Sequence, residues 1–166
     1  MLTTLEGVTP AYVYFSDYIK HQINTLKALF QPEGSPVHVT IRYAMKALSN
    51  ANILRLMDRE GVHFDCSSAY EVMRVIAAGI DPSKIELVTQ DLTREQLDML
   101  QQVPGSDKVL VCASSQQQLD TLLAHEQFRN QVLGIRVNPG FGSGYHSKAV
   151  VAGPKYSFGI WHENLP

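Results

Sequence analysis

The chain has 166 residues, of which 45% are hydrophobic and 18% are charged, and its formal net charge at pH 7 is −2. This composition is typical of a globular domain with a buried core, and it excludes an intrinsically disordered chain. The sequence contains no long basic run, so we expect neither nucleic acid nor a membrane surface as a partner. It also contains no apolar run long enough to span a bilayer and no recognisable secretory signal, and both features predict a cytoplasmic protein.

Two elements are predicted ahead of the main pattern. The apolar stretch 11–15, AYVYF, predicts a short strand, and the residues from Ser16 onward predict an amphipathic helix. The apolar face of this helix consists of Ile19, Ile23, Leu26 and Phe30. A loop rich in proline and glycine then separates the helix from the rest of the chain.

The main pattern is a short apolar run followed by an amphipathic segment, and it occurs five times in succession. The five predicted strands are 38–45, 62–66, 85–89, 108–113 and 133–138. The distance in sequence from the start of one predicted strand to the start of the next is long enough for one strand, one helix and two short loops. The sequence therefore predicts a repeated βα unit.

The predicted helices between the strands carry local start and stop signals. Gly61 and Gly79 are positioned to end the first two helices. A serine or threonine followed three residues later by glutamate or glutamine predicts the start of the later helices. These pairs are Ser68 with Glu71, Thr93 with Gln96, and Ser114 with Gln117.

Repeated βα units build either a doubly wound open sheet or a closed (β/α)8 barrel. In both folds the functional residues lie at the carboxyl ends of the strands. Here those ends carry Lys46, Asp65, Cys66, Thr89, Gln90, Ser114, Arg136 and Asn138. No glycine-rich dinucleotide or P-loop motif follows any strand, which argues against both kinds of nucleotide site. A barrel needs eight units, and about five are present.

The cysteines and histidines do not suggest a metal or redox site. Cys66 and Cys112 lie inside predicted strands without close pairing, so we expect two buried free thiols. The histidines lack the spacing of a metal cluster, and we expect no metal site.

Several motifs together resemble the fold-type III pyridoxal-phosphate (PLP) decarboxylases, which include enzymes acting on diaminopimelate, ornithine and arginine. These motifs are TPAYVY, YAMKALSN, GVHFDCSSAYEVMRVIAAGIDPSKI and GIRVNPGFGSGYH. The resemblance implies an α/β fold, a (β/α)8 TIM-type barrel of the alanine-racemase-like kind, with about its first five βα units present. Residues 1–166 would then be the N-terminal part of the PLP-binding barrel domain, without the family's C-terminal β domain.

The resemblance also implies roles for four residues. Lys46, in YAMKA, would form the Schiff base with PLP, and a partly desolvated lysine at a strand end suits that chemistry. Asp65 and Arg136 would lie beside the cofactor, although Asp65 is equally suited to capping, and a buried Arg136 would require an acidic or phosphate partner. His146, in a glycine-rich loop, would face the substrate or lie in a plain surface turn.

The expected function is PLP-dependent decarboxylation of a small amino acid, namely meso-diaminopimelate to L-lysine, by a homodimeric full-length parent. Ornithine, arginine and carboxynorspermidine are alternative substrates, because Val151 or Ala152 stands where relatives have threonine, and Ser157 where lysine is common. Other family motifs that surround the cofactor do not occur before Pro166, so we expect the chain alone to be inactive. A non-catalytic PLP-binding barrel and a truncated, self-associating fragment are the remaining alternatives.

Overall fold

The computed structural model describes residues 10–144, 146 and 150–165. The chain divides into two compact units, Met1–Val39 and Thr40–Pro166, and each is described by itself. None of the helices in the described residues is long and apolar enough to cross a membrane.

In its described residues, 10–39, the first unit contains one helix, α1 (Ser16–Phe30), which begins where the sequence predicted it. Of its predicted apolar face, Ile23 is buried, whereas Leu26 and Phe30 are exposed. The predicted strand at 11–15 is wrong, because this segment has no strand partner in the described chain and its side chains are exposed. An apolar run becomes a strand only where a neighbouring strand accepts and donates the backbone hydrogen bonds.

The second unit is built on a five-stranded parallel sheet. Its strands are β1 (Arg42–Ala44), β2 (His63–Cys66), β3 (Ile85–Val88), β4 (Leu110–Ala113) and β5 (Leu133–Ile135). The first four are followed by α2 (Ala51–Arg59), α3 (Ala69–Ala77), α4 (Arg94–Gln101) and α5 (Gln116–Ala124). The spatial order of the strands equals their chain order. A doubly wound sheet reverses its order at a switch point, so this topology is that of a barrel wall.

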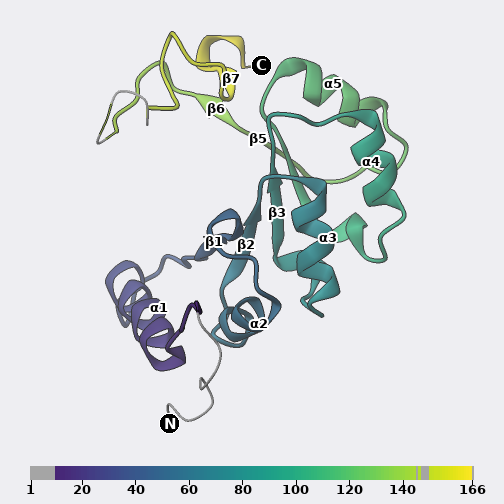
Figure 1. The fold of residues 1–166 in the computed structure, drawn as a ribbon. Helices are drawn as coiled ribbons and strands as arrows, with labels where there is room; N and C mark the ends of the chain where they lie inside the picture. The colour runs from purple at the N-terminus through teal and green to yellow at the C-terminus, as the bar shows by residue number, and fades with distance from the viewer. Residues whose placement is uncertain (1–9, 145, 147–149, 166) are drawn as a thin grey trace. The chain divides into compact units, whose positions relative to one another are not determined.

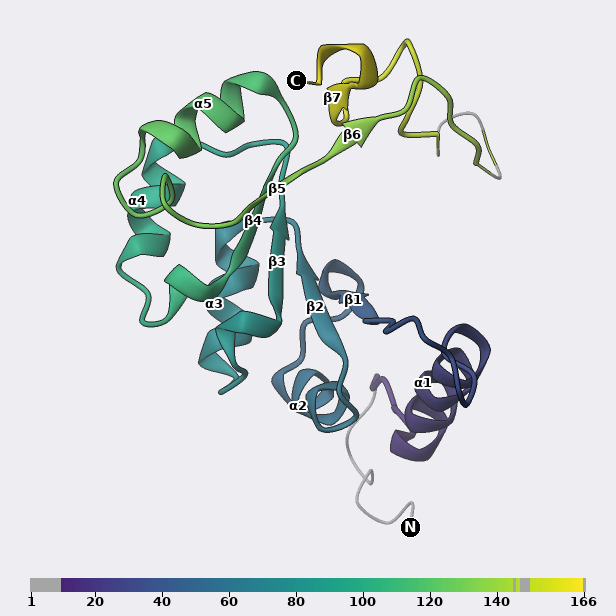
Figure 2. The ribbon, with the colours of Figure 1, turned by 180° about the vertical axis from the view of Figure 1, so that it is seen from behind.

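The hydrophobic core lies on the face of the sheet that the helices cover. Figures 1 and 2 show α3, α4 and α5 on the same side of the strands. Phe64 and Cys66 of β2 are fully buried in this core, while His63 and Asp65 are half-buried. Because side chains alternate along a strand, the half-buried residues belong to the opposite face of the sheet, which is the interior face of a barrel.

The fifth predicted strand, 133–138, is one run in the sequence but two strands in the structure. β5 pairs with β4, and β6 (Val137–Asn138) pairs with a further strand, β7 (Ile160–Trp161). The change of partner falls at Arg136. The first predicted strand is also shorter than expected: 38–41 is not strand, and Met45 belongs to a 3-10 helix, η2 (Met45–Ala47).

The predicted helix starts at Ser68 and Thr93 are confirmed, whereas the one at Ser114 is wrong by one residue. Ser115 is the N-cap of α5, and its hydroxyl accepts a hydrogen bond from the backbone N–H of Gln118. The buried Gln118 amide then links two strand ends. Its Oε1 accepts from Ser114 N at 2.7 Å, and its Nε2 donates to the backbone oxygens of Gln90 at 2.7 Å and Thr89 at 3.2 Å. The side chain of Gln118 therefore holds the end of β3 to the end of β4.

We predict that Gln118→Ala lowers the free energy of unfolding by about 1–3 kcal/mol, because it leaves buried backbone groups without hydrogen-bond partners. Gln117→Ala is the matched control, since Gln117 is exposed and its side chain makes no hydrogen bond in the described chain; it should change stability by less than about 0.5 kcal/mol. Urea unfolding of both variants measures the difference. An equal loss of unfolding free energy in Gln118→Ala and Gln117→Ala would show that the Gln118 amide does not link the strands.

Candidate functional site

Three of the four residues predicted to serve the site line one cleft at the carboxyl edge of the sheet. Lys46 follows β1, Asp65 lies in β2, and Arg136 follows β5. They border a cleft of about 520 Å³ together with Ser67, Val88, Thr89, Gln90, Asp91 and Phe158. Because all five strands are parallel, their carboxyl ends meet at the same edge, and residues far apart in sequence converge there.

Lys46 is placed by the short turn that ends β1. Met45, the residue before it, is fully buried and accepts a hydrogen bond from the Cys66 thiol at 3.4 Å. The hydroxyl of Tyr43 donates to Leu48 O at 3.1 Å and closes the other side of the turn. The Lys46 side chain itself is exposed, so the partial desolvation predicted for it is not found. The reason is that the helices pack on the opposite face of the sheet.

Asp65 is half-buried, and its environment favours the protonated acid. Burial is the main cause that raises the pKa of Asp65 above its ordinary value of 3.8, and the neighbouring Glu86 carboxylate raises it further. Lys46 and Arg136 act in the opposite direction, which means that both cations lie close enough to stabilise the carboxylate. In the described residues Asp65 makes no capping hydrogen bond. The Glu71 carboxylate instead accepts from Ser67 N at 2.6 Å at the start of α3.

A polar network on the same interior face was not predicted from the sequence. Arg42 forms an ion pair with Glu86 at 2.8 Å, and the thiol of Cys112 donates to Glu86 Oε1 at 3.1 Å. Asp65 and Glu86 are partners in the register of β2 and β3, which explains their mutual repulsion. Burial and the bond to Glu86 raise the pKa of Cys112 to about 12, so this thiol is not a nucleophile at neutral pH. The period-two alternation along β1 to β4 was the signal that could have identified this network.

Cys66 and Cys112 are buried free thiols, as predicted. Among the described residues no group of histidines, cysteines and carboxylates could hold a metal ion.

Of the acidic or phosphate partner expected for Arg136, the described residues show only the electrostatic effect of its guanidinium on Asp65. In the described part of the chain no carboxylate forms an ion pair with it, and its guanidinium carbon instead lies 4.4 Å from the centroid of the Phe158 ring. His146 is exposed and is not among the described residues that line the cleft. The structure thus brings Lys46, Asp65 and Arg136 together, and the role of His146 stays a prediction.

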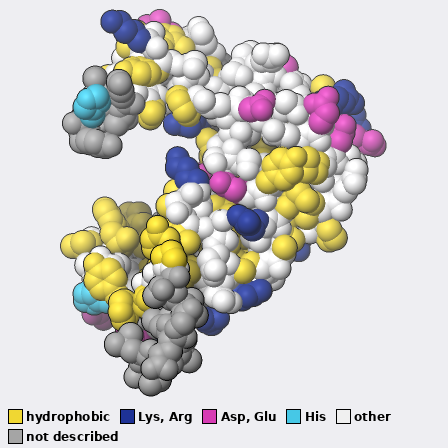
Figure 3. Space-filling view, in the orientation of Figure 1, with side chains coloured by type: hydrophobic (Ala, Val, Ile, Leu, Met, Phe, Trp, Pro, Cys, Tyr) yellow, Lys and Arg dark blue, Asp and Glu magenta, His cyan; other side chains and the backbone are white. Residues whose placement is uncertain are grey.

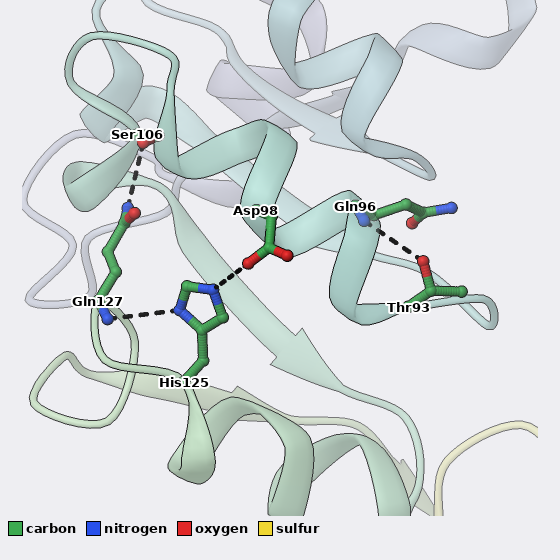
Figure 4. Close-up of polar contacts among 6 residues, drawn as sticks. All are labelled: Thr93, Gln96, Asp98, Ser106, His125 and Gln127. Atoms are coloured by element: carbon green, nitrogen blue, oxygen red, sulfur yellow. Dashed lines mark hydrogen bonds and ion pairs between the residues drawn. The ribbon is translucent and has the colours of Figure 1, made fainter.

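A larger cleft, of about 700 Å³, lies between α4 and α5, and no lysine is among the described residues that line it. Next to it the buried His125 bonds through Nε2 to Asp98 at 3.1 Å and accepts through Nδ1 from Gln127 N at 3.4 Å, as Figure 4 shows. The Gln127 amide donates to Ser106 Oγ at 3.1 Å. These bonds join α4 to the segment after α5, so we assign the cluster a structural role.

The surface charges agree with a small-molecule site. Figure 3 shows basic and acidic side chains interspersed with apolar ones on one face of the molecule, without a broad field of one sign. Within the 520 Å³ cleft, a primary amine, a guanidinium and a carboxylate lie together. An amine can bind an aldehyde, a guanidinium can bind an oxyanion, and a carboxylate can accept an N–H or O–H. This donor set fits a phosphorylated aldehyde such as PLP.

We predict that the pKa of the Asp65 carboxyl group is above its ordinary value of 3.8 and that the pKa of the Asp81 carboxyl group is below it. Hydrogen bonds from Ser83 lower the pKa of the exposed Asp81, which makes it a matched control in the same sample. Because the pKa of Asp65 is raised in the folded state, its ionisation costs stability as pH rises through that value. Asp65→Asn should therefore gain stability over the wild type toward neutral pH. Carboxyl-detected NMR titration tests this, and an Asp65 midpoint at or below 3.8 would contradict it.

A family model described as the pyridoxal binding domain of pyridoxal-dependent decarboxylases matches residues 16–166. The diaminopimelate decarboxylase of Streptomyces coelicolor is 36% identical over 164 residues, which is 96% of this chain and 34% of that protein. The diaminopimelate decarboxylase of Escherichia coli K12 is 32% identical over 161 residues, which is 95% of this chain and 35% of that protein. The chain thus spans about a third of the length of these curated relatives.

Solved structures show the same fold. A crystal structure of a diaminopimelate decarboxylase matches with a TM-score of 0.77 and 32% identity, over 99% of this chain and 37% of that chain. The Helicobacter pylori diaminopimelate decarboxylase complexed with L-lysine matches with a TM-score of 0.80 and 24% identity, over 97% of this chain and 40% of that chain. The family match covers the barrel wall and the residues of the cleft alike. The chain therefore belongs to the pyridoxal-dependent decarboxylases, and its residues 16–166 are part of their pyridoxal-binding domain.

Proposed function

We propose that this chain is the N-terminal part of the barrel domain of a PLP-dependent amino-acid decarboxylase, with Lys46 as the residue that holds the cofactor. The observation that carries this proposal is the convergence of Lys46, Asp65 and Arg136 on one cleft from three separate strands. A lysine amine in the same cleft as a carboxylate and a guanidinium suits a cofactor that is both an aldehyde and an anion.

Each of the three residues has a definite task in this proposal. Lys46, once deprotonated, binds the cofactor's aldehyde through Nζ. Asp65 accepts a proton or a hydrogen bond from the bound groups, and its raised pKa lets it keep a proton up to a higher pH than an ordinary aspartate does. Arg136 receives an oxyanion. When bound, the cofactor supplies a ring that withdraws the electron pair left as carbon dioxide departs.

We propose meso-diaminopimelate as the substrate of the longer protein and L-lysine as its product. The support is that the curated relatives named above, at 32–36% identity, are diaminopimelate decarboxylases. We also propose that the longer protein is a homodimer and acts in the cytoplasm. Decarboxylation of ornithine, arginine or carboxynorspermidine remains the alternative, because the family resemblance implies a threonine in place of Val151 or Ala152 and a lysine in place of Ser157, next to Phe158 of the cleft.

The first prediction from this proposal concerns the attachment site. When the purified chain is incubated with PLP and reduced with borohydride, peptide mass spectrometry should find the pyridoxyl group on Lys46, and Lys46→Arg should abolish that label. Lys108→Arg is the matched control, because Lys108 is exposed and precedes β4 at the opposite edge of the sheet. Labelling spread over the surface lysines would contradict the assignment.

A second prediction concerns the chain alone, which should release no carbon dioxide from any amino acid. Lys46 is exposed on the interior face, so the cleft does not exclude water from the reacting groups. Carbon dioxide release from meso-diaminopimelate, ornithine and arginine measures this, with the Escherichia coli relative as the positive control for meso-diaminopimelate. Release by the 166-residue chain that disappears in Lys46→Ala would overturn the prediction.

A further inference from the structure

We propose that Phe158 is a positioning residue that holds the Arg136 guanidinium at the cleft, so that this arginine receives an oxyanion, either a phosphate or a carboxylate. The guanidinium carbon lies 4.4 Å from the ring centroid, which is the geometry of a cation–π contact. Both residues border the cleft that contains Lys46 and Asp65. The capture of an oxyanion rests on the function proposed above, whereas the contact between the two side chains does not.

The backbone of Arg136 is fixed on both sides. Its N–H donates to Ala113 O in β4 at 2.8 Å, and its carbonyl oxygen accepts from Ile160 N in β7 at 2.7 Å. Arg136 is therefore the residue at which the chain leaves the five-stranded sheet and joins β7. Its main chain has little freedom, and the direction of the side chain is decided by what the guanidinium contacts.

The segment that carries Phe158 is equally restrained. A Cβ on Gly159, which has φ of +85°, would lie 2.7 Å from Asn138 N and 2.9 Å from Arg136 O, so only glycine lets this segment lie directly on the strand. On the other side of Phe158, the Asn138 amide nitrogen donates to the carbonyl oxygens of Gly153 and Tyr156, both at 3.1 Å. The ring is thus presented by backbone held at both ends.

The remaining donors of Arg136 are available to a ligand. Among the described residues, its side chain has neither a hydrogen-bond acceptor nor an ion-pair partner. A guanidinium held over a ring by a cation–π contact makes no hydrogen bond to that ring, so its N–H fork can still bind the two oxygens of a carboxylate or a phosphate. Phe158 restricts the rotamers of this fork without competing for its hydrogen bonds.

The contact between the side chains is tested by NMR without any ligand. The Nε–Hε resonance of Arg136, assigned from its loss in Arg136→Lys, should show an upfield ring-current shift in the wild type. Phe158→Leu should remove the shift, and Phe158→Tyr should keep it. Phe141→Leu, which replaces an exposed phenylalanine that does not border the cleft, should leave it unchanged. An Arg136 resonance that is unaffected by Phe158→Leu would overturn the proposal.

The consequence for binding is tested by equilibrium dialysis with PLP, with pyridoxal, which lacks the phosphate, and with meso-diaminopimelate. Phe158→Leu should weaken binding of an anionic probe by about twofold to fivefold, the effect of losing a partly exposed cation–π contact. In an Arg136→Met background the same substitution should have no effect. If Phe158→Leu loses affinity for PLP alone, the oxyanion that Arg136 binds is the phosphate. If it loses affinity for meso-diaminopimelate alone, the oxyanion is a carboxylate.

Two outcomes of the binding experiment would contradict the positioning role. One is an unchanged affinity for every probe in Phe158→Leu. The other is that Phe158→Leu lowers the affinity equally in the wild-type and the Arg136→Met backgrounds. That result would mean that the ring contacts the ligand directly. If the wild type binds none of the three probes, the proposed function fails, and the ring-current shift of Arg136 still decides whether Phe158 positions it.

Discussion

Parallel pairing of neighbouring strands, in the order in which they occur in the chain, is the constraint on which the rest of this structure depends. It places the ends of β1, β2, β3 and β5 at one edge, so that an amine, a carboxylate and a guanidinium separated by up to ninety residues border a single cleft. It also leaves all four connecting helices to pack on one face. The other face, with its alternating polar residues, is thereby the interior of a barrel wall.

The electrostatics of the cleft follow from that same register. Asp65 and Glu86 are neighbours across β2 and β3, and two carboxylates side by side in a half-buried position cannot both ionise without cost. Arg42 pairs with Glu86, while Lys46 and Arg136 act on Asp65. Charges of both signs alternate across the interior face. This arrangement suits a small ligand that carries an aldehyde and an anionic group.

Much of the secondary structure could be predicted from the sequence, because the period of apolar residues and the helix caps are local signals. They predicted the helix that begins at Ser16, the caps at Ser68 and Thr93, and the end of β2 at Cys66. The change of strand partner at Arg136 and the two-residue β7 were missed, since a partner is chosen by tertiary contacts. Two adjacent serines made the cap at Ser115 ambiguous, and the exposure of Lys46 depends on what covers the interior face.

The most direct test of this account is a crystal structure of the protein grown with PLP. The account predicts continuous electron density from Nζ of Lys46 to the cofactor, with Asp65 and the Arg136 guanidinium, still stacked on Phe158, in contact with it. A cofactor attached to another lysine, or bound in the cleft between α4 and α5, would contradict the central claim that the carboxyl edge of the sheet is the cofactor site.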